Sequence, residues 1–167
     1  RTFTGGVGSE GCPITLNSER ELVMSKKKFP VTEAEVKKHE TAGKADITVT
    51  VDDVSHSFPA IKFSGYLSWT GIDGEWPTSI RIDYGSNLAV GTHTFDFEVS
   101  QKMLSYADAQ GNRRHWPTSG KVEVIVQRPE FGDEFKHVGT LVDVKYGDQS
   151  PVITLNGTYE VGEYEPD

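Results

Sequence analysis

The feature that most constrains this chain is an alternation of apolar and polar residues that recurs along about seven stretches. In the first stretch Ile47, Val49 and Val51 alternate with aspartate and threonine. The others lie near residues 61–69, 80–84, 95–99, 122–126, 138–146 and 152–161. A period of two turns one side of each stretch toward a dry interior and the other toward water, as in antiparallel sheets. The sequence therefore predicts an all-β antiparallel sandwich or flattened barrel of about 7–9 strands.

Clusters of glycine, asparagine and aspartate separate these stretches and predict the turns between strands. They occupy residues 71–74, 85–87, 108–112 and 147–148, and we expect the whole segment 101–118 to be a long loop. Loops of that length in a compact domain are usually functional or disordered.

The C-terminal segment offers two alternatives. Asn156-Gly157 is a common hairpin turn, but a hairpin there would mix polar and apolar residues on one face. One continuous strand instead places a mostly apolar set on one side, formed by Ile153, Leu155, Gly157, Tyr159 and Val161. We favour the continuous strand, in which Gly157 marks a bulge or a close contact.

One short helix is predicted near the N-terminal third. Thr32 and Glu35 match a capping box, and Val31 and Val36 match the accompanying hydrophobic staple, so the helix should run from about Glu33 to Glu40. With 167 residues the chain fits a single domain, 1–167. Residues 1–11 contain four glycines, and we expect them to form a flexible N-terminal arm.

Charge and composition exclude several classes of partner. The chain carries 17 basic and 25 acidic residues, a net charge of −8, which disfavours binding to nucleic acid. Its apolar runs are far shorter than a membrane-spanning helix requires, so no membrane insertion is expected. Cys12 is the only cysteine, which excludes a disulfide within the chain. Because residue 1 is Arg, we expect a processed, exported protein in an extracellular or periplasmic location.

One tetrapeptide occurs twice and carries the functional prediction. Trp76-Pro77-Thr78-Ser79 and Trp116-Pro117-Thr118-Ser119 each follow a polar turn and open an alternating strand. If consecutive strands alternate in direction, both corners lie at one end of the sandwich, together with the loops 70–77, 101–118 and 147–151. The ligand-binding candidates at that end are Trp69, Asp73, Trp76, Tyr106, Asp108, Arg113 and Trp116.

Tryptophan and charged side chains on neighbouring loops are typical of sugar-binding sandwiches, because indole stacks on flat apolar sugar faces and charged groups bond to hydroxyls. The competing interpretation is structural: each Trp fills the open end of the sandwich as a buried ring. Acidic turns around Asp52-Asp53, Asp73 and Asp108 offer part of a calcium site, but none matches the twelve-residue Ca²⁺ loop, so no cofactor is expected. The known nucleophile, phosphate-loop and zinc-protease motifs are missing, and we expect no catalytic activity.

The chain from Gly91 onward resembles the C-terminal half of small bacterial lipoproteins and secreted β-domains that have no assigned activity. The resemblance lies in Gly91-Thr92-His93-Thr94-Phe95, Tyr106-Ala107-Asp108 with Gly111, Ser119-Gly120-Lys121-Val122-Glu123-Val124, Gly139-Thr140 and Ile153-Thr154-Leu155-Asn156-Gly157-Thr158-Tyr159. It implies an exported bacterial protein and assigns no functional residue. The lipoprotein cysteine heads the mature chain, whereas Cys12 lies inside this one, so lipid anchoring is not implied.

Two functional hypotheses follow. The first is a non-catalytic module of a bacterial surface or envelope that binds a glycan or a protein through the Trp-bearing end. The alternative is a structural subunit of a fibre, surface layer or decoration, which self-associates when its N-terminal arm pairs with a neighbour's open sheet edge. A metal-dependent enzyme is the least favoured class.

Overall fold

The computed structural model describes residues 31–147 and 150–167. The chain separates into two compact units, residues 1–35 and 36–167, and both sheets belong to the second. The predicted arm, Cys12 and part of the predicted loop 147–151 lie outside the described residues. In the described part, an all-β sandwich of two antiparallel sheets with one short helix confirms the predicted fold class.

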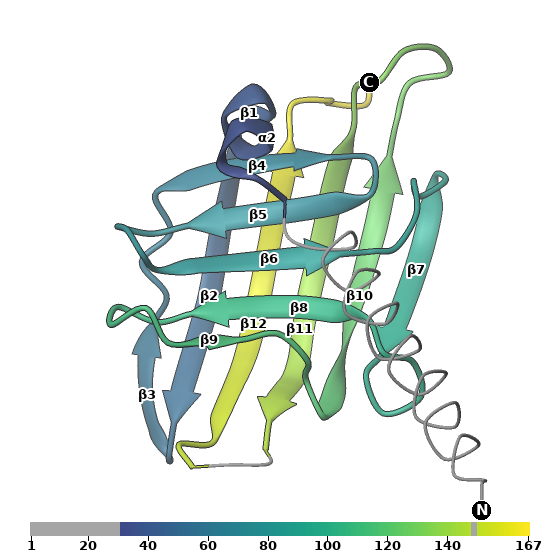
Figure 1. Ribbon diagram of the computed structural model, residues 1–167. Helices are drawn as coiled ribbons and strands as arrows, with labels where there is room; N and C mark the ends of the chain where they lie inside the picture. The colour runs from purple at the N-terminus through teal and green to yellow at the C-terminus, as the bar shows by residue number, and fades with distance from the viewer. Residues whose placement is uncertain (1–30, 148–149) are drawn as a thin grey trace, which may run out of the picture. The chain divides into compact units, whose positions relative to one another are not determined.

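Each sheet contains six strands. Sheet A has the order β1 (Glu40–Thr41), β4 (Lys62–Tyr66), β5 (Trp69–Asp73), β6 (Ser79–Asp83), β8 (Met103–Ala107) and β9 (Arg113–Arg114). Sheet B has the order β3 (Val54–Ser57), β2 (Gly43–Val51), β12 (Ile153–Gly162), β11 (Lys136–Tyr146), β10 (Ser119–Gln127) and β7 (Gly91–Asp96). The strands of sheet A run across those of sheet B, as in the crossed class of sheet packing (Figure 1).

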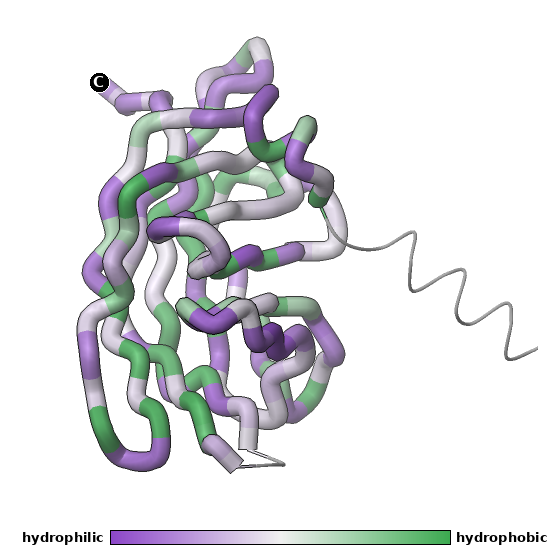
Figure 2. Tube along the Cα trace, turned by 60° about the vertical axis from the view of Figure 1, so that its left-hand side comes forward, coloured by the Kyte–Doolittle hydropathy of each residue, from purple (hydrophilic) through white to green (hydrophobic). Residues whose placement is uncertain are grey.

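The core lies between the two sheets and is built by side chains from alternate positions. Hydrophobic and hydrophilic residues are interspersed along the chain (Figure 2), and along β10 buried positions alternate with more exposed ones. Ile80 and Ile82 of β6 and Val122, Val124 and Val126 of β10 are all buried. Burial of such side chains is the main force that holds the layers together, at roughly 25 cal/mol per Å² of apolar surface.

The C-terminal segment forms one continuous strand, β12, which confirms the choice over a hairpin. Gly157 sits in the middle with φ of +138°, a conformation that side chains disfavour. A Cβ atom there would lie 2.1 Å from the Asp46 carbonyl oxygen of β2. The neighbouring strand β11 shifts register between Leu141 and Val144 opposite this point. Gly157 is therefore required both by backbone conformation and by close strand packing.

A hydrogen-bonded polar chain crosses the core and joins the sheets. Thr70 of β5 bonds to the Tyr84 hydroxyl at 2.7 Å and to His137 Nδ1 at 3.1 Å. The Tyr84 hydroxyl also bonds to that of Tyr159, at 2.8 Å. Burial raises the pKa of Tyr84 to about 12, so this phenol stays protonated. His137 is fully buried on β11, and its Nε2 has no hydrogen-bond partner among the described residues.

The structure corrects two predicted strands, one predicted turn and one predicted loop. The stretch 61–69 is not one strand: it is a hairpin in which Tyr66 pairs with Trp69, and the expected turn at 71–74 is mostly strand β5. The segment 101–118 is not one loop, because β8 and β9 lie inside it. Residues 97–99 leave the sheet after β7: a turn forms as Asp96 accepts backbone bonds from Val99 and Ser100, and Val99 is exposed.

The predicted helix is present as α2 (Glu33–Lys38), two residues shorter than expected. Its capping contact is formed, since the Glu35 N–H donates to Thr32 Oγ1 at 3.1 Å. In the described part of the chain, no helix is long and apolar enough to cross a membrane.

Candidate functional site

The seven predicted ligand-binding residues all belong to sheet A or to its connections. They were expected at one end of the sandwich, because β6 and β10 were taken to run in the same direction. Those two strands lie in different sheets that cross, so the two Trp-Pro corners share no end. What the residues share instead is a sheet: Trp69 and Asp73 lie on β5, Trp76 before β6, Tyr106 on β8, Asp108 and Arg113 around the β8–β9 turn, and Trp116 after β9.

The side of sheet A that faces away from sheet B, here called the outer face of sheet A, therefore organises the candidate site. Strand register places Ser64, Gly71, Arg81 and Ser105 in one row across β4, β5, β6 and β8. Because side chains alternate along a strand, this row points away from the core residues Ile72, Ile80 and Tyr106 of the next row.

Two of the predicted residues are too buried to meet a ligand. Trp69 is 7% exposed on the outer face, and the ring of His39 packs edge-on against it with centroids 6.2 Å apart. Tyr106 is 3% exposed and points into the core from β8. Burial, and then the negative charge of Asp108, raises the pKa of Tyr106, so the phenol stays neutral. Trp69 and Tyr106, which were predicted to bind a ligand, are therefore not accessible to one in this structure.

Asp73 is held in an ion pair that sequence reasoning did not find. Arg81 Nη2 donates to Asp73 Oδ2 at 3.1 Å, and Nη1 donates to Asp73 Oδ1 and to the Ile80 carbonyl. Both side chains are less than one-fifth exposed. The two residues face the same way on neighbouring strands, and this bidentate geometry is the strong form of a carboxylate–guanidinium contact. Both carboxylate oxygens of Asp73 are therefore bonded to Arg81, and this ion pair joins β5 to β6.

The guanidinium of Arg81 covers a floor of small residues. A Cβ atom at Gly71 would lie 2.5 Å from Ser64 Oγ and 3.3 Å from Arg81 Nη1, so the glycine leaves room for the arginine to lie flat. In the same row the hydroxyls of Ser64 and Ser105 are buried and find no hydrogen-bond partner in the described part of the chain. The centre of the outer face is thus closed and packed.

Asp108 shapes its own loop. Its Oδ1 accepts the backbone N–H groups of Gln110 and Asn112, each at 2.9 Å, and its Oδ2 accepts the Asn112 side-chain amide at 3.2 Å. With both oxygens engaged, Asp108 acts as a turn-forming residue rather than as a ligand group. Among the residues that the structure describes, no cluster of His, Cys, Asp and Glu could hold a metal ion.

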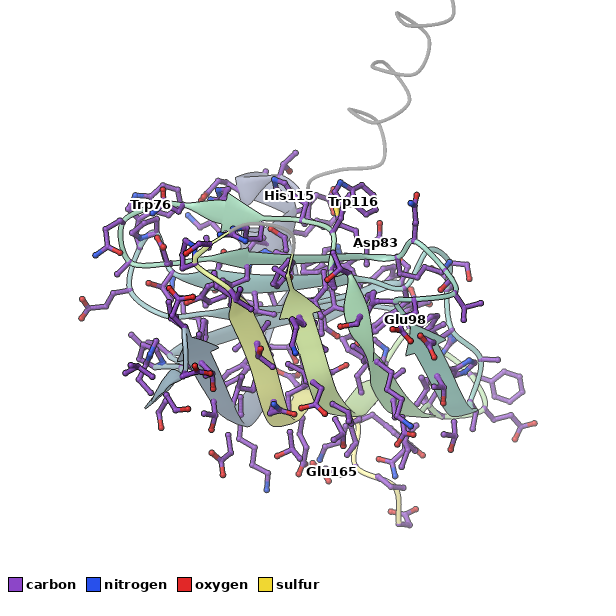
Figure 3. The ribbon with its side chains drawn as sticks, turned by 90° about the horizontal axis from the view of Figure 1, so that it is seen from below. Trp76, Asp83, Glu98, His115, Trp116 and Glu165 are labelled. Atoms are coloured by element: carbon purple, nitrogen blue, oxygen red, sulfur yellow. The ribbon has the colours of Figure 1, made fainter. Side chains whose placement is uncertain are left out.

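Trp76, Trp116 and Arg113 remain available to a ligand. Trp76 is 78% exposed and Trp116 is 50% exposed, which contradicts the interpretation that these two rings fill the end of the sandwich. Figure 3 shows both, with His115, along the outer side of sheet A and well apart from each other. Arg113 is also exposed, on β9.

Strand register locates the three residues relative to one another. Arg113 pairs with Ala107, which pairs with Ser79, so Arg113 lies at the end of sheet A that Trp76 precedes. The turn of Asp108 also reaches that corner, because a Cβ at Gly111 would lie 3.7 Å from Pro77. The Leu104 N–H donates to the His115 carbonyl at 3.2 Å, so the chain continues along β8. Trp116 therefore lies about 10 Å beyond Arg113 in the strand direction.

The immediate surroundings of the two indoles differ. Beside the Trp76 loop, Ile61 is 58% exposed, and its N–H donates to the Asp73 carbonyl at 2.7 Å. Beside Trp116, His115 is partly buried. Burial, and then the positive charge of Arg113, lowers the pKa of His115, so its ring is neutral at pH 7. An exposed apolar side chain thus flanks the Trp76 loop, and a neutral imidazole flanks Trp116.

A shallow groove of about 360 Å³ lies elsewhere, where β7, β10 and β11 meet in sheet B. Its lining includes Asp96, Glu98, Lys121, Asp143 and Lys145. Both acidic and basic side chains line this groove, and its lining contains no aromatic ring. The groove is therefore a weaker candidate for a binding site than the surface with the exposed indoles.

Comparison with models of known protein families, with curated proteins and with solved structures found no match for this chain. The resemblance of the region after Gly91 to bacterial lipoproteins therefore stays a prediction.

Proposed function

We propose that this chain is a non-catalytic binding module of a bacterial surface or envelope, and that it binds a glycan across the outer side of sheet A. The observation that carries the proposal is the exposure of Trp76 and Trp116 on the same side of one sheet. When a sugar face stacks on an indole, apolar surface of both is removed from water, which favours binding. An exposed indole can therefore serve as a stacking platform for a sugar.

The rest of the surface supports this use. Arg113 lies at the Trp76 end and can donate to sugar hydroxyls or to an acidic sugar. The packed centre, with Trp69 buried and Arg81 paired to Asp73, keeps the surface between the two indoles rigid. A rigid surface loses little conformational entropy when a ligand binds.

The separation of the indoles indicates the size of the ligand. Trp76 and Trp116 lie too far apart to clamp a single sugar ring, since Arg113 and a further stretch of about 10 Å come between them. An extended polysaccharide that contacts both rings fits this arrangement better than a monosaccharide.

The test is binding of the purified chain to soluble polysaccharides and to a glycan array, by affinity electrophoresis and calorimetry. Trp76→Ala and Trp116→Ala should each weaken binding, and the double variant should abolish it. Each indole supplies about 1–3 kcal/mol of stacking if it behaves like aromatic platforms for other flat rings.

Phe131→Ala is the matched control, because it removes an exposed aromatic ring that is not on sheet A. It should bind as the unaltered chain does. A double Trp variant that retains full glycan binding would exclude the proposal, and so would retention on proteins alone, which would make the indoles a protein contact.

The assembly hypothesis is favoured by a different observation. Within the described residues, no strand pairs with the outer edge of β7, the last strand of sheet B. The Phe97 N–H donates to the Gly120 carbonyl of β10, and in an antiparallel pair every second residue forms such bonds. Thr92 and Thr94 are the residues in between, so their backbone N–H and C=O groups point away from β10 and toward the open edge. Light scattering measures the oligomeric state of the unaltered chain and of Thr94→Pro, and so tests the assembly hypothesis. An oligomer that the proline disrupts supports assembly through this edge, whereas a monomer in both cases argues against it.

A further inference from the structure

The loop that joins β10 to β11 projects beyond the ends of its strands (Figure 1). It runs from Arg128 to Phe135 and carries the sequence Arg-Pro-Glu-Phe-Gly-Asp-Glu-Phe. Its second aromatic ring, Phe135, is buried, whereas Phe131 is 83% exposed. A lone exposed apolar residue is common on protein surfaces, so the exposure of Phe131 needs further support before it indicates a contact.

The first support is that the loop is held in shape by contacts on both sides of Phe131. The Tyr66 hydroxyl donates to Asp133 Oδ2 at 3.0 Å, and Arg128 Nη2 donates to the Gly132 carbonyl at 3.4 Å. At the base of the loop the Tyr164 N–H donates to the Phe135 carbonyl at 3.1 Å. A loop braced in this way presents Phe131 in a set position, so binding costs less conformational entropy.

The second support is the charge around the ring. Glu130, Asp133 and Glu134 are exposed on the same loop. Exposed Glu163 and Asp167 follow in the C-terminal segment, which bonds to the base of the loop through Tyr164.

The nearby cations are committed to other groups. Lys136 is 13% exposed and pairs with Glu160 and Glu165, and Arg128 bonds to the loop backbone. Arg128 keeps its positive charge, but the three acidic side chains of the loop outnumber it, so the field around Phe131 is negative and attracts a positively charged surface.

We propose that the β10–β11 loop is a second binding surface, on which Phe131 inserts into an apolar pocket of a partner protein whose rim is rich in Lys and Arg. An aromatic anchor surrounded by charges of one sign is the usual anatomy of a small interface: the anchor supplies most of the affinity, and the charges supply the rate and the choice of partner. This surface belongs to the end of sheet B and is separate from the indoles of sheet A.

The experiment uses a random dodecapeptide display library as the probe, selected on the whole chain and counter-selected on Phe131→Ala. Selected peptides are then synthesised and their affinities measured by calorimetry at low and high salt. We expect peptides that combine Lys or Arg with apolar residues, that lose about tenfold or more in affinity for Phe131→Ala, and that weaken as salt rises.

Two variants sharpen the result. The double variant Glu130→Gln with Glu134→Gln should flatten the salt dependence while the chain stays folded, because both side chains are exposed. Trp76→Ala is the matched control and should bind these peptides as the unaltered chain does, so failure here and failure of glycan binding remain distinguishable.

Several outcomes would overturn the proposal. They are no selected peptides, selected peptides that are neutral or acidic, and equal binding to Phe131→Ala. A fourth is light scattering that shows the chain dimerising through Phe131, because a second copy would then occupy the loop in place of a basic partner.

Discussion

The outer faces of the two sheets follow the same pairing rules and yet differ in what covers them. On sheet B the side chains that point away from the core, such as Lys121, Glu123 and Ile125 of β10, are half-exposed. On sheet A the corresponding side chains are packed: Trp69, Met103 and Ser105 are all less than one-tenth exposed. The outward side chains of sheet B are thus in contact with water, whereas those in the central strands of sheet A are mostly buried.

This difference explains why sequence patterns predicted one sheet better than the other. Strand β8 is buried at all five positions, so its sequence Met-Leu-Ser-Tyr-Ala shows no alternation and was taken for part of a loop. A strand that is buried on both faces can be identified only from what packs against it. The short strands β1, β3 and β9 were missed for another reason, because two to four residues are too few to show a period.

We expect the largest difference between the two faces when a large side chain is removed from each and the free energy of unfolding is measured. Trp69→Ala should lower the free energy of unfolding by about 3–4 kcal/mol, because it opens a cavity in a packed surface. Ile125→Ala on sheet B should cost less than about 0.5 kcal/mol, since Ile125 is 46% exposed. Urea denaturation of both variants measures the difference, and equal losses would show that the two faces are equally packed.

The next effect concerns the polar chain between the sheets. Burial, and then the positive charges of Arg128 and His93, lowers the pKa of His137 to about 4 in the folded chain. The unfolded chain therefore binds a proton that the folded chain does not between pH 6.5 and 4. This contribution to stability is complete above pH 6.5 and falls by about 3 kcal/mol as pH drops to 4.

Thermal melts across this pH range, compared between the chain and His137→Asn, isolate the histidine from the carboxylates. The variant should lose most of the slope between pH 6.5 and 5. An unchanged slope would show that His137 is already protonated in the folded chain or is open to solvent.

A smaller effect is expected from the ion pair on sheet A. Arg81→Met should cost about 2 kcal/mol, because it leaves the Asp73 carboxylate in a largely buried site without its partner. The matched change on sheet B, Lys121→Met, removes an exposed pair with Glu123 and should cost about 0–0.5 kcal/mol. A double-mutant cycle with Asp73→Asn gives the coupling directly, and a coupling near zero would mean that the pair adds no stability.

The smallest effect on stability is predicted for the exposed indoles. Trp76→Ala and Trp116→Ala should each change the free energy of unfolding by less than about 0.5 kcal/mol, because both rings are exposed. The proposed function predicts that the same two changes together abolish glycan binding. A loss of more than about 2 kcal/mol for either variant would mean that the ring packs against the fold.

The candidate site was predictable only in part. The repeated Trp-Pro tetrapeptide contains two rings that are exposed in the structure, but the sequence does not distinguish these from the buried Trp69. Asp73 and Asp108 appeared available as isolated acidic residues. Their partners are Arg81 on a neighbouring strand and the backbone of a tight turn, and only register and turn geometry bring these groups together.

By itself the sequence determined the all-β class, the long strands of sheet B and the continuous strand β12. These depend on local alternation, because a period of two places each side chain toward the core or toward water without knowledge of its neighbours. Only the tertiary structure decided the crossing of the sheets, the covered face of sheet A and the place of each tryptophan. Those depend on contacts between strands far apart in the chain, and burial at such contacts is a property of the pair rather than of either residue.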